Sequence, residues 1–192
     1  PTTWEICHTF ATGGDDRDPK LFDAGKYGLG IIWGTYYPRW PQAWENPHSL
    51  QGKSTDLISH TACSRDGQVW SCTYQNYRPG YWMWSVCNTG ATGPDWYYSG
   101  AYHFGGGFND TSHSVHLLDS KNGLDWSWCS IIMDEKHGKK SLPSEPVICA
   151  LGDATLGCLI RQEEDGAILA TGTLPALRWK LMLLQECIHA PA

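Results

Sequence analysis

The sequence feature that most constrains the fold is a seven-residue phrase, S-x-[DN]-G-x-x-W, which occurs twice. Residues 64–70 read Ser-Arg-Asp-Gly-Gln-Val-Trp and residues 120–126 read Ser-Lys-Asn-Gly-Leu-Asp-Trp, while residues 173–179 are a degenerate copy without the Asp and Gly. Asp-Gly and Asn-Gly favour tight turns, because glycine accepts positive φ and Asp or Asn can hydrogen-bond the turn backbone. The copies recur about every 55 residues, an interval typical of a propeller or another repeat array.

Strand-like runs surround each copy in the same order. Three precede the phrase and a fourth follows its Trp, at 19–22, 27–34, 57–63; 83–87, 95–104, 114–119, 130–133; and 146–151, 155–161, 167–172, 180–184. Four short strands per unit are typical of a propeller blade. We therefore predict an all-β chain, a β-propeller of four-stranded antiparallel blades, with about three blades at 17–80, 81–140 and 141–192. A strand at 4–10 would belong to a last blade, and the alternative is a β-sandwich with two chance turns.

Composition limits the classes of partner. Eleven Trp and nine Tyr stand against four Phe, a balance that suits wedges between blades and platforms for sugar rings. A net charge of −6 without a Lys/Arg run argues against a nucleic-acid partner. No apolar stretch reaches the roughly 20 residues of a membrane span. The start at Pro1, without Met or a signal peptide, predicts a mature form or an excised piece.

The chain has eight Cys, none of them in a C-x-x-C pair, so we expect no metal. Residues 147–160 look like a hairpin that turns between Gly152 and Thr155. If these two residues face each other, Cys149 faces Cys158 at about 4.5–5.5 Å, within disulfide reach. The sequence thus predicts either a disulfide or two buried thiols here. We expect an extracellular, secreted or periplasmic location.

One edge of the predicted blades collects candidate site residues. The start of the first strand, the end of the second strand and the loop that follows it share an edge in an up-and-down blade. That edge would hold Arg17, Asp18, Tyr36, Trp82, Trp84, His103, Glu145 and Arg161. Arginine grips carboxylates with a bidentate fork and aromatic faces stack on sugars, so the edge suits an anionic, ring-shaped ligand. The alternatives are surface ion pairs for the charges and packing roles for the aromatic residues and His103.

These residues resemble the sialidase superfamily. The repeated phrase is similar to that family's Asp-box, or BNR repeat, and Arg17-Asp18-Pro19 stands where sialidases carry Arg-x-Pro. Ser144-Glu145-Pro146 precedes a hairpin and then Arg161, as the family's Glu precedes its second carboxylate-binding Arg. The resemblance implies an exo-glycosidase in which Arg17 and Arg161 hold a sugar carboxylate. Glu145 would act as base toward a Tyr, with Asp56, or Glu45 as a fallback, as acid/base.

The chain also departs from that family. A third arginine and a nucleophilic Tyr would come from later blades, and three blades do not close a ring because propellers typically have at least four. The chain is then a fragment, or it associates with a second chain or copy. Arg17-Asp18-Pro19 is also similar to the Arg-Asp-Pro of five-bladed fructosidase-like hydrolases, in which the Asp stabilises the transition state. Glu186-Cys187 comes too late for that family's Glu-Cys motif.

We therefore expect a glycoside hydrolase that acts on an acidic, sialic-acid-type glycan without a metal or organic cofactor. One alternative is a non-catalytic glycan-binding propeller, in which the aromatic residues supply stacking. Another is a polysaccharide lyase, in which His103 and a Tyr abstract a proton beside a uronate that Arg17 or Arg161 neutralises. A purely structural protein is a further alternative.

Overall fold

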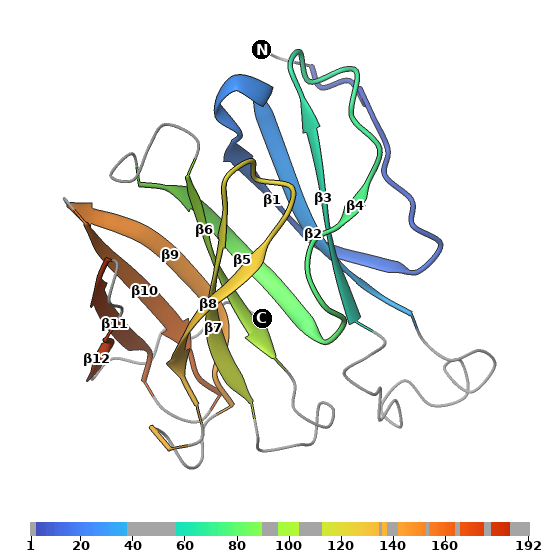
Figure 1. Cartoon of the computed structure of the whole chain (residues 1–192). Coiled ribbons are helices and arrows are strands. Elements are labelled where there is room, and N and C mark those ends of the chain that lie inside the picture. Colours follow the sequence, from blue (N-terminus) through green and yellow to red (C-terminus); the bar gives the residue numbers. More distant parts are fainter. Residues whose placement is uncertain are drawn as a thin grey trace, which may run out of the picture.

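The protein is all-β in a computed structural model of the 192-residue chain. The structure describes residues 3–37, 57–89, 96–103, 113–134, 136–137, 142–152, 154–163, 166–174 and 178–184. These residues contain no α-helix. They form three four-stranded antiparallel sheets, which lie side by side in chain order (Figure 1).

Each sheet is a meander of four consecutive strands, and the predicted strand runs are confirmed. The first sheet contains β1 (Asp15–Asp23), β2 (Leu29–Tyr36), β3 (Leu57–Ser64) and β4 (Tyr74–Gln75), with a 3-10 turn at Gly25–Tyr27. The second contains β5 (Tyr81–Asn88), β6 (Tyr97–His103), β7 (Ser114–Ser120) and β8 (Ser127–Met133). The third contains β9 (Ser144–Gly152), β10 (Thr155–Arg161), β11 (Ile168–Thr173) and β12 (Lys180–Leu183). The expected strand at 4–10 is wrong, because residues 3–14 form no strand.

The repeated phrase forms the turn that its chemistry predicts. Asp66 accepts hydrogen bonds from the backbone N–H groups of Gln68 and Val69 at 2.8 and 2.9 Å. Asn122 accepts the equivalent pair, both at 2.9 Å, in the second copy. The glycines have φ of 75° and 72°, a conformation that glycine adopts without steric cost. These turns join the third and fourth strands of the first two sheets.

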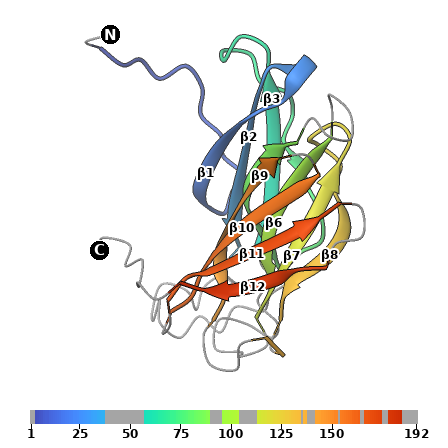
Figure 2. The same cartoon turned by 90° about the vertical axis from the view of Figure 1, so that its left-hand side faces the viewer.

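Serine hydroxyl groups form hydrogen bonds between neighbouring sheets. Ser59 of β3 donates to the Tyr81 carbonyl and accepts from the Met83 N–H of β5, both at 2.9 Å. Ser85 of β5 in turn donates to the Pro146 carbonyl of β9 at 2.9 Å and accepts from the Ile148 N–H at 2.8 Å. The first strand of a sheet thus lies against the preceding sheet, as Figure 2 also shows for β9 and its neighbours.

Two glycines allow these sheets to approach closely. A Cβ added to Gly34 of β2 would lie 2.3 Å from the Trp82 indole, and one added to Gly100 of β6 would lie 2.9 Å from the Pro146 carbonyl. Apolar side chains fill the rest of each interface. Phe22, Ile32, Met83, Tyr97 and Leu118 lie between the first and second sheets, and Val115, Leu117, Ile148, Leu156 and Ile160 lie between the second and third.

Of the two alternatives for Cys149 and Cys158, the disulfide is wrong, and the pair of buried thiols is right for Cys158 alone. Gly152 does face Thr155, but the register shifts before Leu156, which pairs with Ala150. Cys149 therefore lies opposite Gly157, and Cys158 opposite Ile148. Successive side chains of a strand point to opposite faces, so the slip leaves Cys149 exposed and Cys158 buried, both as free thiols. Burial raises the pKa of the Cys158 thiol, which keeps it protonated.

Candidate functional site

The first strand of every sheet contains an irregularity in its pairing. The register of β1 shifts between Arg17 and Lys20, and that of β5 between Met83 and Ser85. In β9 the shift lies between Ser144 and Val147, where Glu145 and Pro146 together face the single residue Ile160 of β10. A bulge of this kind bends the strand and re-aims side chains, and bulges are common beside active sites.

Two of these bulges hold a carboxylate on a strained backbone. Asp18 has φ of 54° and Glu145 has φ of 50°, and each residue precedes a proline. Positive φ costs a residue with a side chain about 1–3 kcal/mol, and a following proline restricts the backbone further. A strained residue persists only where its surroundings hold it, and such residues cluster at functional sites. The positive φ therefore makes both carboxylates candidates for a functional role.

Glu145 lies in an ion pair with Arg161, as their hairpin placement predicts. The Arg161 guanidinium donates to Oε1 of Glu145 at 2.6 Å and approaches Glu163 at 3.4 Å. Burial by itself would lower the pKa of Arg161, but the hydrogen bond and charge of Glu145 raise it. The Arg161 and Glu145 side chains are 36% and 29% exposed, so a ligand can reach both.

Tyr102 of β6 completes this cluster, and the sequence interpretation missed it. Its ring lies parallel to Trp82, with centroids 6.2 Å apart, and 6.0 Å from Trp84. Burial, and then the charges of Glu145 and Asp18, raise the pKa of Tyr102, so its hydroxyl stays protonated. Tyr102 lies near the end of β6, the second strand of its sheet, and Arg161 lies at the end of β10, the second strand of the next sheet. This shared position in the two sheets is the signal that could have identified Tyr102.

The two tryptophans have different environments. Trp82 is buried against Gly34 and belongs to the core. Trp84 is half-buried, and the Lys20 ammonium lies over its ring at 4.1 Å. Trp84 is therefore the better candidate for a stacking surface, once a ligand competes with Lys20 for its face.

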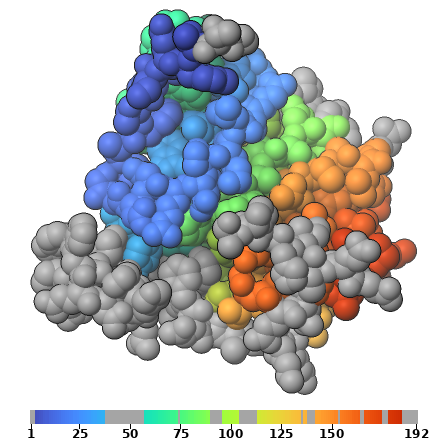
Figure 3. All heavy atoms as spheres, turned by 180° about the vertical axis from the view of Figure 1, so that it is seen from behind, coloured from blue at the N-terminus to red at the C-terminus, as the bar shows by residue number. Residues whose placement is uncertain are grey.

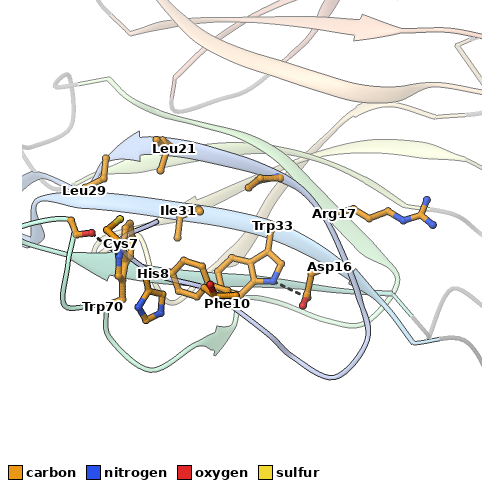
Figure 4. Close-up of a pocket in the computed structure, with 13 residues that line it drawn as sticks. Cys7, His8, Phe10, Asp16, Arg17, Leu21, Leu29, Ile31, Trp33 and Trp70 are labelled. Carbon is orange, nitrogen blue, oxygen red and sulfur yellow. Dashed lines mark hydrogen bonds between the residues drawn. The ribbon is translucent and has the colours of Figure 1, made fainter. Parts of the chain in front are cut away.

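Arg17 forms an ion pair with a different carboxylate from the one that Arg161 binds. Its guanidinium forms an ion pair with Asp15 on its own strand, and that hydrogen bond is the main reason why the pKa of Arg17 is raised. Arg17 also lines one end of a groove on the first sheet, and in Figure 4 its guanidinium extends away from Phe10 and Trp33. A ligand that Arg17 and Arg161 both bind would have to displace Asp15 and Glu145 from them.

The remaining predicted residues lie around this cluster or outside the described residues. Tyr36 is buried on β2. His103 packs against Tyr81, with ring centroids 4.6 Å apart, and 6.3 Å from His116. Asp56 and Glu45, the expected acid/base residues, lie outside the residues that the structure describes.

A groove of about 600 Å³ lies on the first sheet, on the face turned away from the second sheet. Leu21, Leu29 and Ile31 line it from the sheet, and Phe10 and Cys7 line it from the N-terminal segment 3–14 (Figure 4). Asp16 holds that segment, because it accepts hydrogen bonds from Thr12, Thr35 and Trp33. These bonds outweigh the effect of partial burial and lower the pKa of Asp16.

Neither metal ligands nor membrane helices are found among the described residues. No group of three or more His, Cys, Asp or Glu side chains in the described ranges could hold a metal ion. No helix in the same ranges is long and apolar enough to cross a membrane.

Comparisons with known proteins show the fold alone. No family model matches the sequence, and no curated protein matches it. A solved structure of a protein of unknown function from Dyadobacter fermentans matches with a TM-score of 0.68 and 17% identity, over 97% of this chain and 55% of that chain. An N-acetylgalactosamine deacetylase from F. plautii, solved with blood group B trisaccharide, matches with a TM-score of 0.59 and 13% identity, over 89% and 52%. The chain thus spans about half the length of the structures that it resembles.

Proposed function

We propose that this protein is a carbohydrate-active β-propeller domain of the sialidase type, a glycoside hydrolase that acts on acidic glycans. One observation carries the proposal: Asp18 and Glu145 occupy bulges of the first strands of two sheets, on strained backbone, and Glu145 forms a partly exposed ion pair with Arg161. Most glycoside hydrolases use a pair of carboxylates, whereas sialidases use a Tyr nucleophile, so in a sialidase-type reaction Glu145 would serve as the base toward a Tyr. The meanders with their repeated turns support the propeller, and the sugar-bound deacetylase supports a carbohydrate ligand.

The residues of this cluster have complementary roles in that reaction. Arg161 binds the carboxylate of an acidic sugar, for which a charge-assisted hydrogen bond contributes about 1.5–3 kcal/mol. Glu145 and Asp18 supply carboxylates for proton transfer or for stabilising the positive charge that develops on the sugar ring; acid/base assistance contributes about 10²–10⁴ in rate. Protonated Tyr102 donates a hydrogen bond, and Trp84 stacks on the sugar ring.

A second candidate function is glycan binding without catalysis. Glu145 already bonds to Arg161 at 2.6 Å, and a neutralised pair of this kind can bind sugar hydroxyl groups without reacting. In this case Glu145→Gln keeps much of the binding and no product forms. A uronate lyase remains the third alternative, with the contact between Tyr81 and His103 as its catalytic pair.

A mass-spectrometric screen for released product tests these functions. The protein is incubated with sialylated and uronate-containing glycans, beside Glu145→Gln, Asp18→Asn and Arg161→Ala, with the exposed Glu5→Gln as a matched control. Release of a free acidic sugar, lost in the three site variants and kept in the control, supports the hydrolase. An unsaturated product supports the lyase, and binding without product supports the glycan-binding function.

A further inference from the structure

The two faces of the second sheet are covered by its neighbours. Figure 3 shows this sheet, mostly in green, between the first sheet in blue and the third in orange and red, and apolar side chains fill both interfaces. One end of the second sheet holds the pair Tyr81 and His103, beside the candidate site. The opposite end, where Tyr97 pairs with Ser120 and the turn 120–126 begins, contains a separate cleft.

This cleft has a volume of about 340 Å³, which is near the lower end of the range of about 300–1,000 Å³ for small-molecule sites. Its lining combines one aromatic ring with polar and charged side chains, mainly those of Trp96, Asp119, Lys121, Asn122, Asp125 and Ser127. Asp119 and Ser127 pair directly across β7 and β8, so their side chains lie on the same face of the sheet. Asn122 Nδ2 donates a hydrogen bond to Asp125 Oδ2 at 2.8 Å, which holds that second carboxylate in place.

Two polar groups of the cleft lack partners. Among the residues that the structure describes, the carboxylate of Asp119 accepts a hydrogen bond only from its own backbone N–H, although partial burial raises its pKa. The indole N–H of Trp96 is buried and has no hydrogen-bond partner in the same part of the chain. Most buried polar groups of native proteins are hydrogen-bonded, so each exception requires an explanation. An unpaired acceptor and an unpaired donor in one cleft indicate a ligand that has both kinds of group.

The turn itself requires neither Trp96 nor Asp119. The first copy of the phrase forms the same turn, and strand pairing places Gly28 and Cys63 of the first sheet at the equivalent positions. Gly28 has no side chain, and Cys63 is only a weak hydrogen-bond acceptor. The ring and the carboxylate of the second sheet are therefore additions to the turn, and both of them line the cleft.

We propose that this cleft binds a neutral sugar, with the sugar ring packed on Trp96 and its hydroxyl groups bonded to Asp119 and Ser127. A hydroxyl group both donates and accepts hydrogen bonds, which matches the two unpaired groups of the cleft. Asp119 and Asp125 against Lys121 give the lining a net charge of −1, so an acidic sugar is repelled. The cleft is separate from the ion pair of Glu145 and Arg161, and the inference does not depend on the proposed function.

Lys121 controls access to the ring of Trp96. Its ammonium lies 5.1 Å from the centre of that ring, and its charge opposes the effect of burial on the pKa of Asp119. A cation–π contact is weak at an exposed position, and Lys121 is exposed, so a sugar can displace it and then accept a hydrogen bond from its ammonium. Because Lys121 already supplies positive charge beside Asp119, a cationic ligand is disfavoured.

Saturation-transfer NMR tests the proposal on the full chain. The neutral probes are the methyl glycosides of glucose, galactose, mannose and N-acetylglucosamine, and the counter-probes are methyl glucuronide and tetramethylammonium. We expect a neutral glycoside to bind and Asp119→Asn to weaken that binding about tenfold or more, because a charge-assisted hydrogen bond is lost. Trp96→Phe keeps an aromatic ring but removes the N–H and part of the stacking face, so it also weakens binding.

Arg65→Ala is the matched control, because Arg65 occupies the position of Lys121 in the first copy of the turn, and it keeps the binding of the unmodified chain. Circular dichroism checks that each variant is folded. Asp119→Asn leaves Glu145 and Arg161 intact, so its effect reports on this cleft and not on the proposed active site. A chain that binds none of the neutral glycosides would overturn the proposal. Tighter binding of either counter-probe, or neutral-sugar binding that Asp119→Asn and Trp96→Phe leave unchanged, would equally overturn it.

Discussion

The positive φ of Glu145 predicts that glycine is tolerated better than alanine at this position. Glu145→Ala and Glu145→Gly both remove the carboxylate and its bond to Arg161, so the pair isolates the backbone effect. Alanine keeps a Cβ at φ of 50°, which costs about 1–2 kcal/mol. Glycine avoids that cost but loses about 0.4–1 kcal/mol through the greater freedom of the unfolded chain.

We therefore expect Glu145→Gly to be more stable than Glu145→Ala by about 0.5–1 kcal/mol. Urea unfolding followed by Trp fluorescence measures this difference. With a slope of about 2–3 kcal/mol/M, the midpoint of the glycine variant lies about 0.2–0.5 M higher. Neither variant retains activity in the glycan assay.

The control is the same pair of substitutions at Val147, two residues along β9. No positive φ is recorded there, so glycine is expected to be less stable than alanine by about 0.5–1 kcal/mol. The opposite sign at two neighbouring positions is the signature of strain at Glu145. An alanine variant at least as stable as the glycine variant at position 145 would refute the reasoning.

Three further predictions concern other parts of the structure. Asp16→Asn weakens the hydrogen bonds to Thr12 and Thr35, so hydrogen exchange of residues 3–14 becomes faster. Because the pKa of Asp16 is lowered on folding, the Asp16 carboxylate stabilises the folded protein above about pH 4, and this stabilisation is lost as the pH falls below that value. Burial and the charge of His103 lower the pKa of His116 to about 4. The free energy of unfolding therefore falls by roughly 2–3 kcal/mol between pH 7 and pH 4, because the unfolded chain takes up a proton at His116 and the folded chain does not. His116→Gln is expected to flatten this pH dependence. Ser85→Ala removes the two hydrogen bonds that Ser85 makes to β9 and leaves the Ile148 N–H unpaired, at a cost of about 1–3 kcal/mol in the free energy of unfolding measured by denaturation. The control is Ser127→Ala, at an exposed position. An equal loss in the free energy of unfolding there would contradict the role of the Ser85 hydrogen bonds in holding the two sheets together.

The local features of this protein were predictable because their causes are local. Strand alternation depends on neighbours two residues apart, and the turns at 64–70 and 120–126 depend on Asp, Asn and Gly within a few positions. The meeting of Glu145 and Arg161 also followed, because one hairpin joins them and its turn fixes their register to within a residue.

Contacts across sheets were not predictable in the same way. A one-residue bulge after Gly152 separated Cys149 from Cys158, and nothing in the spacing of the cysteines reveals such a slip. Tyr102 entered the site from β6 of another sheet, and its partners come from strands up to about 85 residues away in sequence.

The sequence by itself determined the all-β class, the grouping of strands by four and the turn chemistry, since each depends on short-range pattern and conformational preference. The tertiary structure alone decided which carboxylates are strained and which aromatic side chains gather beside them. Those properties depend on how sheets pack over long sequence separations. They are also the properties on which the proposed site rests.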